Sequence, residues 1–191
     1  SFAILCGFFL LPLILFITLI LFLFTDDDIF YYQMRIGKNG KKFKLIKFRT
    51  MSSDENILIN YFKKYPNQKI YWDKNHKLLD DPRITRIGVF LRESSLDELP
   101  QIFNVLRQEM SFIGPRPIVE EEINKYGNSF NLYKTVEPGL SGLWQVSGRN
   151  NTTYNERVAL DVEYIENKSL VMDIKIFFKT FKTILLREGA Y

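Results

Sequence analysis

The sequence has 191 residues, a net charge of +4 and 46% hydrophobic residues, which suffices for one globular domain with a buried core. It contains a single cysteine and a single histidine, so the sequence excludes an internal disulfide and a histidine-rich metal site.

The chain opens on an apolar run, residues 2–24, that carries no charge. This is about the length that a helix needs to cross a bilayer, and the run is too long for a signal peptide. Pro12 lies in its middle and removes a backbone hydrogen bond, so a kinked segment that enters and leaves the membrane on one face is possible. A plain spanning helix is the alternative, because such helices tolerate proline.

Three aspartates, Asp26 to Asp28, end the apolar run. Paired aspartates bind a metal in some nucleotide-sugar enzymes, but directly after an apolar segment a solvated stop at the membrane interface is the better interpretation.

A basic segment without acidic residues covers positions 29–53. Asn39-Gly40 within it predicts a two-residue hairpin turn. Alternation along a strand at 43–49 puts Lys47 and Arg49 on one face with apolar residues, so we expect both to point into a phosphate-binding site. A solvated basic strand is the alternative. The lysines at the hairpin tip are expected to meet anionic lipid headgroups.

Further along, the pattern predicts a helix at 54–64 capped by Ser53, a loop at 66–77, and a helix that begins at Asp81-Pro82. The next stretch sets two adjacent carboxylates, Asp97 and Glu98, at the start of a helix with one apolar face.

Ser95, three residues before Glu98, completes a capping-box pattern, which usually indicates only a helix start. At that end of a helix the dipole favours ionised carboxylates. Arg92 precedes the acidic pair, and Arg116 follows it between Pro115 and Pro117. The prolines fix the backbone, so the Arg116 side chain loses little freedom on binding an anion; a rigid turn with a solvated arginine is the alternative.

The C-terminal third is expected to hold a short acidic helix at 120–126, a glycine-punctuated loop at 141–150 and a helix at 155–166. The loop carries Trp144 and Arg149 and can hold a nucleobase or sugar, although Trp144 fits a core position equally well. Asp161 is a polar candidate on the helix. Residues 170–186 form an amphipathic pattern with a lysine stripe, which suits either a membrane surface or packing onto the domain.

Four long motifs occur in order, namely KFRTM (47–51), DPRITRIGVFLRESSLDELPQ (81–101), FNVLRQEMSFIGPRP (103–117) and PGLSGLWQVSGRN (138–150). Together they resemble the bacterial sugar transferase family, the monotopic polyprenyl-phosphate phosphoglycosyl transferases. The loop at 142–150 and the C-terminal REGAY are most similar to catalytic domains of undecaprenyl-phosphate galactose- or glucose-phosphotransferases. Those often carry further N-terminal membrane helices, which agrees with a chain that begins without Met.

The resemblance implies that a UDP-sugar gives its sugar 1-phosphate, galactose or glucose, to undecaprenyl phosphate and that UMP leaves. Asp97 would be the nucleophile that forms a phosphosugar–aspartate intermediate, and Glu98 would help to hold Mg²⁺. It further implies that Arg92, Arg116 with its flanking prolines, and a re-entrant helix broken at Pro12 belong to the working parts. Charge neutralisation by Mg²⁺ and cations is what phosphoryl transfer requires, and it needs neither His nor Cys.

The expected fold is α+β and mostly helical, with a re-entrant membrane helix at 1–28 and a catalytic domain at 29–191 that contains a small β-hairpin and amphipathic surface helices. Substrate-binding residues are expected among those with suitable charge or rigidity: Lys47, Arg49, Arg92, Pro115, Arg116, Pro117, Arg149 and Asp161.

We expect the protein in the bacterial inner membrane, with its domain on the cytoplasmic side where nucleotide sugars are made, and the basic hairpin agrees with that orientation. Its partners would be membrane lipid and a second copy in a homodimer, but no nucleic acid. Such an enzyme would perform the first membrane step of glycoconjugate assembly. Two other hypotheses are a non-catalytic module that binds anionic lipid, and a metal-dependent glycosyl transferase that uses Asp26 to Asp28.

Overall fold

The computed structural model describes residues 2–75, 78, 80–148 and 152–185. It is an α+β fold in which helices dominate, as expected. The helices of four or more residues are α1 (Phe2–Phe24), α2 (Glu55–Lys64), α3 (Pro66–Asn75), α4 (Arg86–Glu93), η2 (Leu96–Gln101), α5 (Ile102–Leu106), α6 (Ile123–Tyr126), α7 (Phe130–Tyr133), α8 (Tyr154–Asn167) and α9 (Leu170–Leu185). Shorter 3₁₀ turns are η1 (Lys38–Gly40), η3 (Glu120–Glu122), η4 (Gly127–Ser129) and η5 (Trp144–Val146). The strands are β1 (Phe30–Ile36), β2 (Lys42–Phe48), β3 (Ser111–Ile113) and β4 (Gly139–Ser141).

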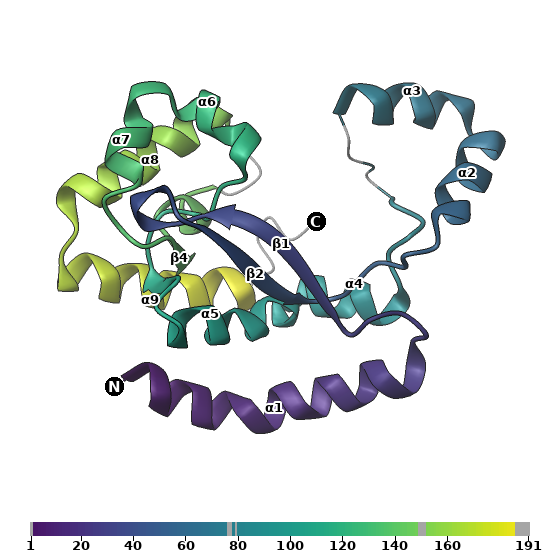
Figure 1. The fold of residues 1–191 in the computed structure, drawn as a ribbon, viewed down its shortest axis with the longest axis horizontal. Coiled ribbons are helices and arrows are strands. Elements are labelled where there is room, and N and C mark those ends of the chain that lie inside the picture. The colour runs from purple at the N-terminus through teal and green to yellow at the C-terminus, as the bar shows by residue number, and fades with distance from the viewer. Residues whose placement is uncertain (1, 76–77, 79, 149–151, 186–191) are drawn as a thin grey trace.

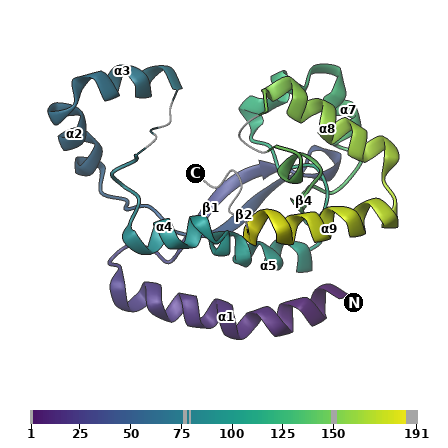
Figure 2. The same cartoon turned by 180° about the vertical axis from the view of Figure 1, so that it is seen from behind.

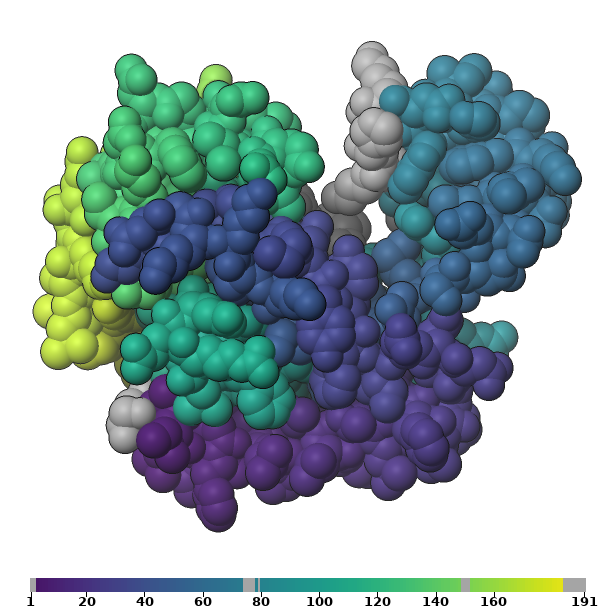
Figure 3. Space-filling model, viewed as in Figure 1, coloured from purple at the N-terminus to yellow at the C-terminus, as the bar shows by residue number. Residues whose placement is uncertain are grey.

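The apolar run forms one helix, α1, which continues through Pro12 and bends near its middle (Figures 1 and 2). It lies lengthwise along the lower edge of the molecule, beneath α4 and α5, and does not project from it (Figure 3). Within the described part of the chain it is the one helix long and apolar enough to cross a membrane. Only 17% of its most apolar window is buried, so most of its apolar surface is uncovered by protein.

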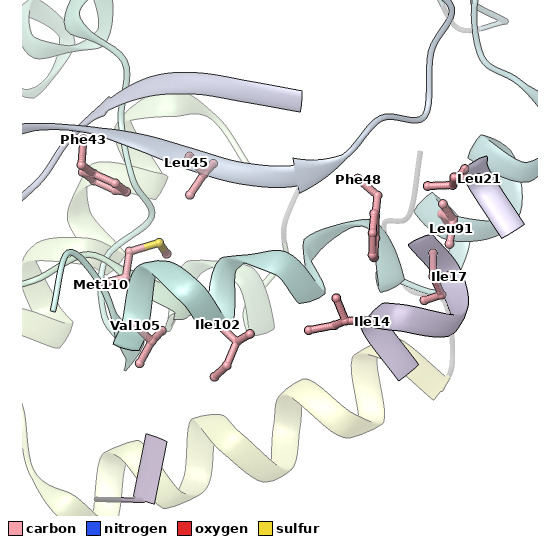
Figure 4. Close-up of a cluster of buried hydrophobic side chains, with 10 residues drawn as sticks. All are labelled: Ile14, Ile17, Leu21, Phe43, Leu45, Phe48, Leu91, Ile102, Val105 and Met110. Atoms are coloured by element: carbon pink, nitrogen blue, oxygen red, sulfur yellow. The ribbon is translucent and has the colours of Figure 1, made fainter. Parts of the chain in front are cut away.

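The first core lies between α1 and the β1–β2 hairpin (Figure 4). The strands pair antiparallel with Phe30 opposite Phe48. Phe48 points from the end of β2 toward Ile14 and Ile17 of α1, and Ile102 of α5 lies beside them. The membrane-type helix and the expected catalytic domain therefore share one hydrophobic core.

The hairpin turn lies where it was predicted, and Asn39 and Gly40 both adopt positive φ angles of 58° and 72°. The connection is longer than two residues, however, because Ile36 pairs with Lys42 and the residues between them include the 3₁₀ turn η1. Two lysines near the tip differ from expectation. Lys38 pairs with Glu137 (2.8 Å) and Lys42 with Glu120 (2.6 Å), and the tip points away from α1 (Figure 1).

A second cluster of side chains joins the hairpin to α6, α7 and α8, with Ile36, Ile118, Tyr126 and Tyr133 buried at its centre. Next to it, β3 and β4 pair in parallel, with Ser111 opposite Gly139. The helix α9 lies at the level of α5 and leaves apolar side chains exposed, namely Leu170, Val171, Ile174, Phe177, Phe178 and Phe181.

Helices α2 and α3 form an arm that stands apart from the body (Figure 3). The loop prediction for 66–77 was wrong, because Pro66 occupies the first position of α3, where its fixed φ angle suits a helix. The helix predicted to start at Asp81 also begins later. Thr85 caps α4, while Asp81 instead pairs with Arg83 (2.6 Å). Asp54, not Ser53, caps α2.

Candidate active site

The acidic pair lies in η2, which follows a sharp turn out of α4. Ser95 makes that turn with φ 56° and ψ 17°, a left-handed conformation that few non-glycine residues adopt. The capping-box prediction was wrong: Ser95 makes no side-chain capping bond to the described residues, and Glu98 turns its carboxylate to Lys47 instead. The turn places Asp97 and Glu98 beside the end of β2.

Lys47 and Glu98 form an ion pair in which Nζ lies 2.6 Å from Oε1, with side chains 20% and 30% exposed. The strand that carries Lys47 is held in register by the fully buried Asn104 of α5. The Asn104 Oδ1 accepts from the Ile46 amide (3.1 Å), and its Nδ2 donates to the Lys44 carbonyl (2.8 Å). Asn104, from the helix that follows the Asp97–Glu98 pair (the dyad), thus fixes the strand that faces this dyad.

Arg92 approaches from the last turn of α4. Its Nε donates to Thr50 Oγ1 (2.9 Å) and its Nη2 contacts Met51 Sδ (3.1 Å). This contact depends on a close approach of α4 to the chain after β2. A Cβ atom on Gly88 would lie 2.0 Å from the Thr50 carbonyl oxygen, so only glycine permits it.

The environment raises the pKa of Asp97 to about 6, mainly because burial penalises the charged form and secondly because Glu98 is adjacent. Lys47 and Arg92 oppose the shift and hold the value below neutrality. The expectation that a helix dipole keeps this group readily ionised was therefore wrong in sign, although at pH 7 Asp97 is still mostly a carboxylate. It is a half-buried, poorly solvated anion flanked by two cations.

Arg49 is not brought to the dyad. The strand ends at Phe48, and the Arg49 Nε donates to the Asp28 carbonyl (2.9 Å) while Nη2 lies 3.4 Å from the Asp28 carboxylate. The neighbouring Asp27 accepts hydrogen bonds from the backbone and hydroxyl of Ser53, which lower its pKa. Two of the three aspartates after α1 are thus engaged in local contacts.

The Pro115–Arg116–Pro117 turn is held rigidly. Both prolines are buried, and the Pro115 and Pro117 carbonyls accept bonds from the Gly139 amide (2.8 Å) and from Arg35 Nη1 (2.8 Å). The Arg116 guanidinium lies 5.5 Å from the centre of the Trp144 ring, so Trp144 lines the site.

Asp161 of α8 is fully buried and accepts a bond from the Tyr126 hydroxyl (2.6 Å). Burial raises its pKa to about 6. It does not line the small cavity beside Glu98 that is described below. Arg149, the remaining expected residue, lies outside the described residues.

A small cavity of about 10 Å³, room for about one water molecule, lies between Glu98 and the proline turn, and its wall includes Arg35, Lys47, Glu98, Gln101 and Arg116. Sequence reasoning placed Arg35 only among the basic residues of the hairpin and passed over Arg157 and Glu122 altogether. The position of Arg35 on a predicted strand, among apolar residues, was a sequence signal that could have identified it. The sequence contained no such signal for Arg157, because the residues that surround it come from distant segments of the chain.

The sequence model of the family described as bacterial sugar transferase matches residues 1–187. The chain belongs to the bacterial sugar transferase family. It is 48% identical over 170 residues to the exopolysaccharide production protein ExoY of Sinorhizobium fredii, covering 88% of this chain and 75% of that protein.

Two further relatives bear more specific names. The UDP-galactose-lipid carrier transferase of Erwinia amylovora is 48% identical, and the undecaprenyl-phosphate galactose phosphotransferase of Salmonella typhimurium 47% identical, each over 162 residues or 84% of this chain. The chain spans only 34% of the length of each.

The carboxylates at this site decide whether it fits Mg²⁺. Among the described residues there is no cluster of three or more acidic, histidine or cysteine side chains that would hold a metal alone. Mg²⁺ commonly keeps several waters and takes one or two protein carboxylates plus substrate phosphates. Adjacent Asp97 and Glu98 fit that second mode, with Glu98 as the available protein ligand once it leaves Lys47.

Proposed function

We propose that this protein transfers a hexose 1-phosphate, galactose or glucose, from a UDP-sugar to undecaprenyl phosphate and releases UMP. Membership of the sugar transferase family and the names of its relatives support the substrates. One observation carries the mechanism: the poorly solvated Asp97 carboxylate lies beside the Lys47–Glu98 pair and is flanked by Arg92.

In the first step an Asp97 oxygen attacks the β-phosphorus of the donor. A new phosphorus–oxygen bond forms, the bond to the bridging oxygen breaks, and its electron pair leaves with UMP. A carboxylate of limited solvation is a competent nucleophile, since little water has to be displaced from it. Lys47 and Arg92 offset the negative charge of the approaching phosphate.

In the second step a phosphate oxygen of undecaprenyl phosphate attacks the phosphorus of the phosphosugar–aspartate. The acyl phosphate bond breaks, and the Asp97 carboxylate is restored. Mg²⁺, held by Glu98, would neutralise phosphate oxygens in both steps. This reaction would begin the assembly of an exopolysaccharide, capsule or O-antigen on its lipid carrier.

The position of α1 supports a re-entrant helix that enters and leaves the inner membrane at its cytoplasmic face. Because α1 lies along the body, crossing the bilayer upright would carry α5 and the dyad into the hydrocarbon. A shallow α1 with both ends on one face, beside the exposed apolar side chains of α9, keeps the dyad at headgroup depth. In a Cys6→Ser background, single cysteines at positions 1 and 28 should both react with a membrane-impermeant reagent from the cytoplasmic side. Reaction of one end from each side would establish a spanning helix.

The reaction is tested by UMP release from a panel of UDP-sugars with Mg²⁺ and undecaprenyl phosphate. Asp97→Asn should abolish release, whereas Asp73→Asn, which removes an exposed aspartate on the arm, should leave it unchanged. Rapid quenching of the wild type with radiolabelled donor and no lipid should trap labelled protein, and Asp97→Asn should trap none.

Release that persists in Asp97→Asn would remove this residue as nucleophile while keeping the enzyme class. Folded protein that releases UMP from no donor would instead favour a module that only binds anionic lipid.

A further inference from the structure

An open cavity of about 390 Å³ lies next to the small cavity beside Glu98, and the two share Arg35 and Arg116 in their walls. The larger one also contains Arg157 and Glu122 and the rings of Trp144 and Tyr154. Three arginines thus surround a single lining carboxylate, Glu122, which leaves the cavity with excess positive charge.

Arg157 carries most of the argument, because its guanidinium is buried and only some of its nitrogens form hydrogen bonds. The residue is 8% exposed, and Nη1 donates to Glu122 Oε1 (3.0 Å). Its guanidinium carbon lies over two aromatic rings, 4.9 Å from the centre of Trp144 and 5.0 Å from that of Tyr154. Its Nε and Nη2 atoms are buried and have no hydrogen-bond partner within the described residues.

Those two atoms share one edge of the guanidinium and form a fork that binds two oxygens at once. The same protein shows the fork in use elsewhere: Nε and Nη2 of Arg83 hold the two carboxylate oxygens of Asp81 at 2.9 and 2.6 Å. Buried donors without acceptors are costly. The unpaired fork of Arg157 is therefore complementary to an anion with two oxygens.

The charges around the fork favour the same ligand. Arg35 lies 3.8 Å from Glu122, and its own Nε is also buried without a partner. Burial, and next to it the charge of Arg116, lowers the pKa of Arg35 to about 10, so the guanidiniums repel one another across the cavity. The second buried acid nearby, Asp161, does not line the cavity; its Oδ2 accepts a hydrogen bond from Tyr126, and its charge also acts on Arg157.

The location indicates a water-soluble ligand. Glu122 directly precedes α6, and Arg157 belongs to α8. Both helices lie on the side of the molecule away from α1 in both views (Figures 1 and 2). A lipid phosphate held at the level of α1 would reach the dyad before it reached this cavity. A nucleotide arriving from solution meets the arginines first.

We propose that the cavity around Arg157 binds the nucleoside monophosphate half of the donor, with its phosphate on the Arg157 fork and its nucleoside beside Trp144 and Tyr154. The inference rests on the proposed function. When the bond to the bridging oxygen breaks, the departing phosphate gains a negative charge, and the arginines stabilise that charge. The same cavity then holds UMP until release.

The test is UMP binding to the purified full-length chain in detergent, without sugar donor or lipid, so that no turnover is needed. In a Trp72→Phe background, Trp144 alone reports the cavity by its fluorescence. Arg157→Gln should weaken UMP binding about 10- to 100-fold, the usual effect of losing charge-assisted hydrogen bonds. Arg157→Lys keeps the charge but loses the fork and should fall in between.

Arg107→Gln is the matched control, because it removes one exposed arginine elsewhere on the surface and should leave UMP affinity unchanged. Uridine should bind far more weakly than UMP. If Arg157→Gln does not fold, Arg116→Gln must show the loss, since Glu122 then keeps both of its arginine partners. Unchanged UMP affinity in either folded variant would overturn the inference.

The two proposals fail separately. Asp97→Asn should bind UMP with wild-type affinity although it does not turn over. Wild-type turnover together with unaltered UMP affinity in Arg157→Gln would refute the cavity assignment alone. Arg157-dependent UMP binding without turnover of any donor would refute the proposed reaction and retain the nucleotide site.

Discussion

Asp97→Asn should make the protein inactive and also more stable at pH 8. Folding forces this carboxylate into a poorly solvated position next to Glu98, which raises its pKa from 3.8 to about 6. The folded state therefore binds the proton more tightly than the unfolded state. As the pH rises from about 4 to 6 the unfolded chain loses its proton first, so stability falls through this window and stays lower above it.

The size of the effect follows from the pKa difference of about two units. Each unit corresponds to 1.36 kcal/mol, which gives an upper figure near 3 kcal/mol; partial exposure of the side chain reduces it to about 1–3 kcal/mol. For a chain of this length, one kcal/mol shifts the melting temperature by about 2–4 °C. We expect Asp97→Asn to melt roughly 3–10 °C above the wild type at pH 8.

Thermal melting in detergent with EDTA at pH 8 and at pH 4.5 measures this, and the gap in melting temperature should shrink to about a third at the lower pH, because the unfolded carboxyl with its pKa of 3.8 is then still mostly ionised. Glu122→Gln is the control of opposite sign, because a hydrogen bond from the Val119 amide and the charges of Arg157 and Arg35 lower the pKa of Glu122 despite its burial. That variant should melt below the wild type at pH 8. Asp97→Asn melting at or below the wild type at pH 8 would refute the reasoning.

Three further outcomes are expected. The initial rate of UMP release should fall about tenfold per pH unit below pH 6 as Asp97 takes up a proton, and a flat profile down to pH 5 would show that this group does not limit the reaction. Gly88→Ala should push α4 away from the chain after β2, cost about 1–3 kcal/mol and displace Arg92, lowering both melting temperature and turnover. Asn104→Leu should leave two buried backbone groups without hydrogen-bond partners and lower the free energy of unfolding by about 2–6 kcal/mol. Asn60→Leu, at an exposed position, should change the melting temperature little. Equal melting temperatures of these two variants would contradict the assigned role of Asn104.

Local patterns were enough to predict much of the fold. The uncharged run predicted both ends of α1, Asn39-Gly40 predicted the position of the hairpin, and the amphipathic pattern at 170–186 predicted α9. Helix starts were harder to place, because Ser95 and Asp81 are good capping residues that do something else here. Ser95 adopts a left-handed backbone conformation, and the Asp81 carboxylate pairs with Arg83, two residues later, although the sequence pattern favoured a cap.

The dyad and Lys47 were predictable, since adjacent acids and a strand-face lysine are local features. Arg49 was misplaced because alternation holds only within a strand, and β2 ends one residue earlier. Arg157 was missed because its significance depends on Glu122 and Trp144, which come from other segments of the chain. Burial of a partly bonded charge is a property of the assembled structure and has no signature in the sequence.

The core shared by α1 and the hairpin has a consequence for how the protein is made. Ile14 and Ile17 leave the ribosome early, but their partner Ile102 is synthesised more than eighty residues later. During that interval the lipid interface is the available cover for α1. Removing residues 1–28 to obtain a soluble enzyme would also strip one wall from the core beneath the dyad. We therefore expect such a truncation to aggregate, whereas detergent or a nanodisc around the intact chain preserves the site.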